Sequence, residues 1–85
     1  MAEDTPPPSR ELMLDYEQKA ESAYTQMYDA QPWDEKDLKD DALFYLARAI
    51  EVADALGLEQ DAARLNARVD NIMGVYNSQF RGNWR

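Results

Sequence analysis

Residues 35–56 constrain the fold more than any other segment, because their apolar side chains lie on two sides of a predicted helix. At about 100° per residue, two bulky stripes run along this helix with alanines between them. One stripe holds Leu38, Tyr45, Val52 and Leu56, the other holds Leu43, Leu46 and Ile50, and the ridge between them holds Ala42, Ala49 and Ala53. Such a helix needs a neighbour on either side. The segment therefore predicts the middle helix of a bundle.

Two further helices are predicted on either side of this segment, over residues 10–29 and 59–81. Their apolar residues recur at spacings of three and four, and no segment alternates with the period of two that strands require. Short connections make successive helices antiparallel. We therefore expect an all-α fold, a small antiparallel three-helix bundle. It forms a single helical domain over residues 10–85, behind a flexible proline-rich leader at residues 1–9.

The expected helix ends rest on residues with strong local preferences. Ser9 and Asp34 are placed to cap the first and second helices, since their side-chain oxygens can accept from backbone N–H groups. Pro32 ends the first helix, because the residue before a proline disfavours helical geometry. Gly57 suits the left-handed position after the second helix, and Leu58 can fold back onto its last turn.

The 85-residue chain contains neither cysteine nor histidine, which excludes many kinds of site. There is no disulfide, no thiolate nucleophile, no imidazole base and no histidine-bearing zinc site. No glycine-rich phosphate loop is present. No stretch approaches the ~20 apolar residues of a membrane span, and the acidic N-terminus is unlike a secretory signal. We expect a cytoplasmic protein that is not an enzyme and that uses no cofactor and no metal.

The net charge of −8 is distributed unevenly along the chain. Residues 1–41 hold twelve acidic and four basic residues, whereas residues 42–85 hold five of each. Within the second half, residues 62–85 carry four arginines and one aspartate, a local charge of +3. Such asymmetry affects partners and encounter rates, but it does not decide the fold.

The densest acidic run comprises Asp34, Glu35, Asp37, Asp40 and Asp41. One interpretation is a site for a divalent cation, since Asp37 and Asp41 lie one turn apart on a helix. The run lacks the loop pattern that wraps oxygens around calcium. The favoured interpretation is a solvated helix start, where acids are stabilised by the helix dipole.

Two apolar features lie away from the predicted core. Phe44 falls among charged residues on the outer side of the middle helix, where it either anchors a partner or contacts the first helix. Ala63, Ala67 and Gly74 form a smooth strip opposite the core stripe of the third helix. Gly74 in this strip indicates either that another helix packs closely there or that the fold tolerates a residue that weakens the helix.

The C-terminal segment places aromatic residues at intervals of four: Tyr76, Phe80 and Trp84, with Arg81 and Arg85 beside them. One interpretation is an aromatic-basic tail that docks on a partner. The favoured interpretation is that Tyr76 and Phe80 close the core while Trp84 packs on the end of the bundle. The overall negative charge argues against direct nucleic-acid binding.

The sequence predicts a small, non-enzymatic helical module that binds another protein through exposed apolar helix surface. The alternative is an acidic inhibitor that mimics nucleic-acid phosphates and blocks a nucleic-acid-binding protein or nuclease. A homodimer is also expected, because the first helix relies on tyrosines and methionines for its inner face. No membrane partner is expected. The candidate partner-binding residues are Phe44, Asp37, Asp40, Asp41, Ala63, Ala67, Gly74, Phe80 and Trp84.

Overall fold

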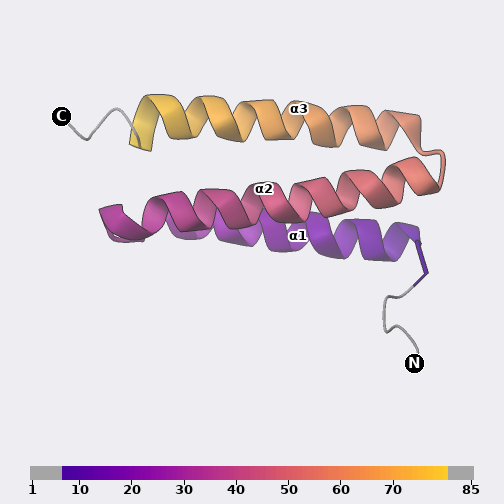
Figure 1. The fold of residues 1–85 in the computed structure, drawn as a ribbon, viewed down its shortest axis with the longest axis horizontal. Helices are drawn as coiled ribbons and strands as arrows, with labels where there is room; N and C mark the ends of the chain where they lie inside the picture. Colours follow the sequence, from indigo (N-terminus) through magenta and orange to yellow (C-terminus); the bar gives the residue numbers. More distant parts are fainter. Residues whose placement is uncertain (1–6, 81–85) are drawn as a thin grey trace.

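The computed structural model describes residues 7–80, which form three α-helices and no strand (Figure 1). The helices are α1 (Arg10–Met27), α2 (Pro32–Ala55) and α3 (Glu59–Val75). A π-helical turn, η1 (Tyr76–Phe80), continues from α3. The expected all-α three-helix arrangement is confirmed. Part of the predicted leader, residues 1–6, lies outside the described residues.

Helix α1 begins where the sequence places its cap and ends earlier than expected. Ser9 is extended, with φ −154°, and its Oγ accepts a hydrogen bond from the backbone N–H of Leu12 at 3.1 Å. The helix stops at Met27, two residues before the predicted end at residue 29. The N–H groups of Tyr28 and Asp29 bond to carbonyls only three residues back, which tightens the last turn.

Helix α2 begins at Pro32, three residues before the predicted start, so Asp34 is not its cap. Gln31 takes the cap position with extended geometry, ψ 153°, and makes no side-chain cap bond. Proline is well suited to the first helical position, because its φ is already helical and its missing N–H would have no partner there. Asp34 therefore lies inside the first turn, and its N–H bonds to the carbonyl of Gln31 at 2.8 Å.

The turn from α2 to α3 has the geometry that Gly57 predicts. Gly57 has φ +72°, the left-handed region. The N–H of Gly57 bonds to Asp54 O at 3.1 Å, and the N–H of Leu58 bonds to Ala53 O at 2.9 Å. This pair of bonds is a Schellman motif, which satisfies carbonyls at the end of the helix. It turns the chain so that α3 runs back along α2 (Figure 1).

The core lies along α2, which packs against α1 and α3 and so occupies the expected middle position. Three of its alanines, Ala42, Ala49 and Ala53, are fully buried with Leu46. Small side chains allow the neighbouring backbones to approach closely. The other buried residues are Met13, Ala20, Ala23 and Met27 on α1, Val52 on α2, and Leu65 and Ile72 on α3.

Ion pairs connect α3 to α1. Arg64 bonds to Glu17, and Arg68 bonds to Glu21, so both partners advance by four residues from one pair to the next. A third pair joins Arg10 Nη1 to Asp61 Oδ2 at 2.8 Å. This order shows that α1 and α3 run parallel, as an up-down-up bundle requires. Within residues 7–80, no helix has both the length and the apolar character needed to cross a membrane.

Candidate functional site

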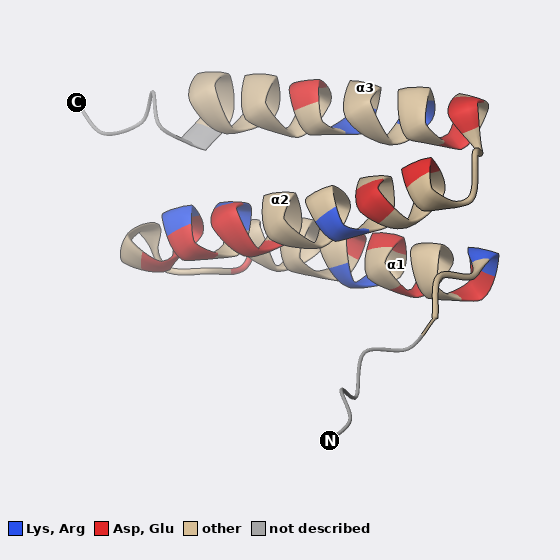
Figure 2. Cartoon of the chain, turned by 45° about the vertical axis from the view of Figure 1, so that its right-hand side comes forward, with Lys and Arg blue, Asp and Glu red and all other residues tan. Residues whose placement is uncertain are grey.

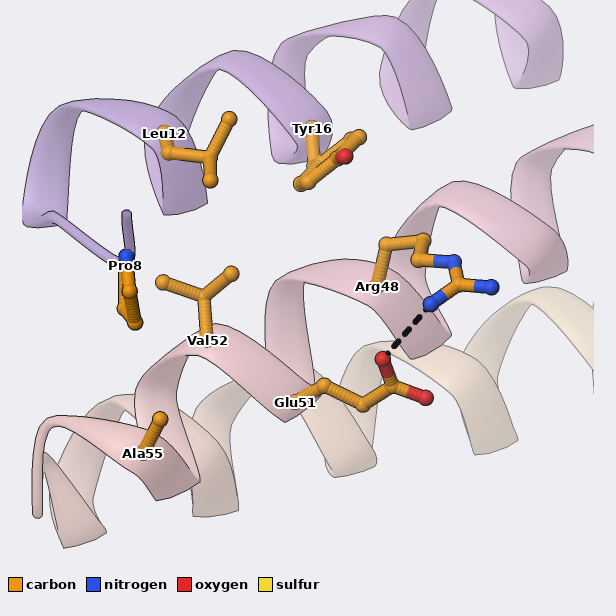
Figure 3. Close-up of a pocket in the computed structure, with 7 residues that line it drawn as sticks. All are labelled: Pro8, Leu12, Tyr16, Arg48, Glu51, Val52 and Ala55. Atoms are coloured by element: carbon orange, nitrogen blue, oxygen red, sulfur yellow. Dashed lines mark hydrogen bonds and ion pairs between the residues drawn. The ribbon is translucent and has the colours of Figure 1, made fainter. Parts of the chain in front are cut away.

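Two hollows lie between α1 and α2 on one face of the helix pair. The first has a volume of about 210 Å³ and is shown in Figure 3; it is lined by Pro8, Leu12, Tyr16, Arg48, Glu51, Val52 and Ala55. The second has a volume of about 320 Å³ and is lined by Lys19, Ser22, Ala23, Gln26, Leu38, Asp41 and Tyr45. No residue of α3 lines either hollow. We call the two hollows together the α1/α2 groove.

The groove follows from the spacing of its lining residues. On α2 these residues are 38, 41, 45, 48, 51, 52 and 55, which follow one another mainly at steps of three and four. On α1 they recur in the same way, from Leu12 to Gln26. Residues at such spacings share one face of a helix. The two hollows therefore lie in line on the same face of both helices.

Stacked aromatic rings lie between the two hollows. Tyr16 of α1 and Tyr45 of α2 face each other with ring centroids 6.3 Å apart and planes 25° apart. Phe44 meets Tyr45 edge to face at 5.4 Å. Lys19 Nζ lies 5.9 Å from the Tyr45 ring centroid, and the Arg48 guanidinium carbon lies 5.3 Å from that of Phe44. These contacts hold the aromatic rings in fixed positions along the groove.

The charged groups of the groove fall into two classes. Its two cations are already paired, Lys19 with Asp15 at 3.5 Å and Arg48 with Glu51 at 2.8 Å. Asp41, by contrast, lines the second hollow and makes no ion pair among the described residues. At the end formed by the first half of α2, residues 34–41 hold five acids and two lysines, which gives this end of the groove a local charge of −3.

No protein-family model matches the chain, and no curated protein or solved structure shows significant similarity to it.

The predicted acidic candidates differ in their environments, as the mixed charges along the start of α2 in Figure 2 indicate. Asp40 accepts a hydrogen bond from Lys36 at 2.8 Å and pairs with Lys39 at 3.0 Å. The bond from Lys36, followed by that from Lys39, holds the pKa of Asp40 below its ordinary value. Asp37 and Asp41 are exposed and make no such pairs. Among the described residues, no three acidic side chains gather in a way that could hold a metal ion.

Phe44 is 52% exposed, which agrees with its predicted position away from the core stripes. The structure adds that it is not isolated, because its ring is packed on Tyr45 and beneath Arg48. Phe44 therefore lies at the edge of the α1/α2 groove. Of the predicted candidates that the structure describes, Asp41 lines the second hollow and Phe44 contacts the lining residues Tyr45 and Arg48.

The predicted strip on α3 is uncovered and separate from the groove. Ala63, Ala67 and Gly74 are all exposed. A Cβ atom added at Gly74 would meet nothing within 4 Å. Within residues 7–80, Gly74 is therefore not required for close packing. The side chain of Phe80, and the whole of Trp84, lie outside the described residues.

The floor of the groove is apolar surface that the sequence predicts to face the core. Periodicity places Tyr45 and Val52 in one stripe of the second helix, and it places the tyrosines of the first helix on that helix's inner face. Leu12, Tyr16 and Tyr45 are only partly buried, although they pack against the core. The seven-residue spacing of Leu38, Tyr45 and Val52 can be read from the sequence. It does not show that neighbouring helices leave part of this apolar stripe uncovered.

Proposed function

We propose that this protein is a non-enzymatic interaction module that binds a helical segment of a partner protein in the α1/α2 groove. The observation that carries the proposal is the alignment of two hollows along one face, with aliphatic and aromatic side chains between them. Apolar grooves between helices are a common way to receive an amphipathic helix.

The groove has the composition of a binding surface. Its floor contains aliphatic and aromatic groups, Leu12, Tyr16, Tyr45 and Val52, and its edges carry charged side chains. Aromatic anchors surrounded by polar groups often supply most of the binding energy of an interface. Because Tyr16 and Tyr45 are already stacked, binding would cost little further ordering of these rings.

A pair of matched arginine substitutions tests the location. Ala55→Arg places a long side chain in the first hollow, whereas Ala67→Arg makes the same change on the exposed strip of α3. Both alanines are helical and exposed, so both variants should keep the helical circular dichroism of the parent. We expect Ala55→Arg to abolish partner binding and Ala67→Arg to retain it.

Binding can be read by photo-crosslinking in native lysate. A benzoylphenylalanine replacing Phe44 should crosslink to a discrete partner, and the crosslink should disappear in the Ala55→Arg background. The control position is Leu14 on α1, which is 43% exposed and lines neither hollow. Equal crosslinking from Leu14, or a Phe44 crosslink that survives Ala55→Arg, would contradict the proposal. Mass spectrometry of the crosslinked band identifies the partner. It also shows whether the crosslinked protein is a second copy of this chain.

The acidic-inhibitor alternative is supported by the exposed carboxylates of Asp37 and Asp41, which have no ion-pair partner among the described residues. Binding through these groups should weaken steeply with salt, whereas docking of apolar side chains should change little. Once a partner is known, its affinity at low and high ionic strength decides between the two functions. The homodimer remains a prediction, and sedimentation at high protein concentration tests it.

A further inference from the structure

The charge of the groove indicates what kind of helix it receives. Resting on the proposed function, we infer that the occupant is a basic amphipathic helix, with lysine or arginine residues beside the apolar anchor that enters the second hollow. The inference combines the shape of the groove with the positions of its paired and unpaired charges.

The two cations of the groove lie beside acids of their own helices. Lys19 is paired with Asp15, and Arg48 is paired with Glu51, so each pair adds no net charge to the groove. Asp41 lines the second hollow without an ion pair. Asp37 precedes it by one turn and therefore lies on the same side of α2. A bound helix meets these two carboxylates at one end of the groove.

The acids on the far side of the bundle strengthen the contrast. Glu17, Glu21 and Asp61 form ion pairs with arginines between α1 and α3. Their charges are already balanced within the fold. The start of α2 keeps a local charge of −3 after its two lysines are counted, and this charge supplies a field that favours basic partners and speeds their approach.

The spacing of the hollows sets the spacing of the anchors. On α2, the lining residues of the second hollow span 38–45 and those of the first span 48–55. The two centres are thus ten residues apart, which is about 15 Å along a helix. An occupant helix needs two bulky apolar side chains about three turns apart. Between them it must pass over the Tyr16–Tyr45 pair, where a smaller residue fits.

Three synthetic helical peptides test the charge of the occupant. They share leucines at the two anchor positions and alanines at the intervening positions of the same face, and they differ only in their polar residues, which are lysine, glutamine or glutamate. Each is titrated into the ¹⁵N-labelled full-length chain, and amide chemical shifts report both the affinity and the location. We expect the lysine peptide to bind at least tenfold more tightly than the glutamine peptide, with the largest shifts at Tyr16, Tyr45 and Val52.

Matched variants separate local charge from net charge. The double variant Asp37→Asn/Asp41→Asn and its control Asp54→Asn/Asp70→Asn both raise the net charge by two. Asp54 and Asp70 are exposed and lie outside both hollows. The first variant should bind the lysine peptide at least fivefold more weakly than the parent does, and it should lose most of the parent's preference for the lysine peptide over the glutamine peptide. The control should change this affinity and this preference only slightly. A lysine peptide with the same composition but scrambled order should shift no groove residue.

The outcomes distinguish this inference from the proposed function. If the glutamine or glutamate peptide binds the groove as tightly as the lysine peptide, the inferred charge is wrong and the docking function stands. If the two double variants lose affinity equally, the attraction comes from net charge and the inference is overturned. If none of the amphipathic peptides shifts the groove residues, both the inference and the docking function fail.

Discussion

Arg68 of α3 holds the carboxylate of Glu21 on α1 with two of its nitrogens, Nε to Oε2 at 2.8 Å and Nη2 to Oε1 at 2.7 Å. The two residues are 47 positions apart in the sequence. The guanidinium carbon of Arg68 also lies 4.7 Å from the ring centroid of Tyr24. Only two residues of α3, Leu65 and Ile72, are buried. Ion pairs to α1 therefore add to the apolar contacts by which Leu65 and Ile72 hold α3 on the core.

Replacing Glu21 should loosen this attachment. We expect Glu21→Gln to lower the free energy of unfolding by about 1 kcal/mol, because a paired bidentate contact is lost although its groups are partly exposed. The control is Glu51→Gln, which removes only the local pair with Arg48 and should cost a few tenths of a kcal/mol. Urea unfolding followed by circular dichroism measures both. Equal losses in the two variants would show that the α1–α3 pair adds no particular stability.

Acidification should weaken the ion pairs that Asp61 makes with Arg10 and Arg64. The hydrogen bond from Arg64, together with the charge of Arg10, holds the pKa of Asp61 below its ordinary value of 3.8. Because the folded state resists protonation more than the unfolded state, this contribution is present above the unfolded pKa. It is lost as the pH falls through the lower folded-state pKa.

We therefore expect the urea midpoint to fall between about pH 5 and about pH 2.5. The Asp61→Asn variant should show a smaller fall over the same range, since the group that titrates has been removed. Asp70→Asn, which removes an exposed acid that forms no ion pair among the described residues, should behave as the parent does. A full-sized fall in Asp61→Asn would exclude Asp61 as a contributor.

The two described glycines should respond in opposite ways to alanine. Gly74 lies in helical backbone with open space around its missing Cβ, so Gly74→Ala should stabilise the protein by about 0.5–1 kcal/mol. Gly57 has φ +72°, so Gly57→Ala should destabilise it by about 1 kcal/mol or more. Thermal unfolding measures both. Destabilisation by Gly74→Ala would indicate that another helix covers the α3 strip in solution.

Truncation of the core should separate buried from exposed leucines. Leu46 is fully buried within the cluster between the helices, so Leu46→Ala should cost about 2–5 kcal/mol by losing contacts and leaving a cavity. Leu14→Ala, at a position that is 43% exposed, should change stability by less than about 0.5 kcal/mol. Similar losses at both positions in urea unfolding would contradict the placement of Leu46 in the core.

Local features of the sequence predicted most of the fold. Ser9 and Gly57 act through their own backbone and side-chain geometry, so their roles as cap and turn were visible without any tertiary information. The start of α2 was predicted wrongly because two local signals compete there. Asp34 has the side chain of a good cap, but Pro32 can begin a helix by itself, and the proline prevails.

The candidate site was predicted only in part. Phe44 could be placed on an outer face from helical periodicity. The groove beside it could not, because Tyr16, Tyr45 and Val52 have the same spacing whether a third helix covers them or not. Periodicity shows which side of a helix is apolar, but it does not show how much of that side its neighbours cover.

The sequence alone thus determined three helices, their approximate ends and the two-sided character of α2, because these follow from interactions within a few residues. Only the tertiary structure decided which stripe of α2 is left partly open. It also decided that Arg64 and Arg68 pair with Glu17 and Glu21, while Asp37 and Asp41 form no ion pair within residues 7–80. These outcomes depend on how helices distant in the sequence pack side by side, which no local preference encodes.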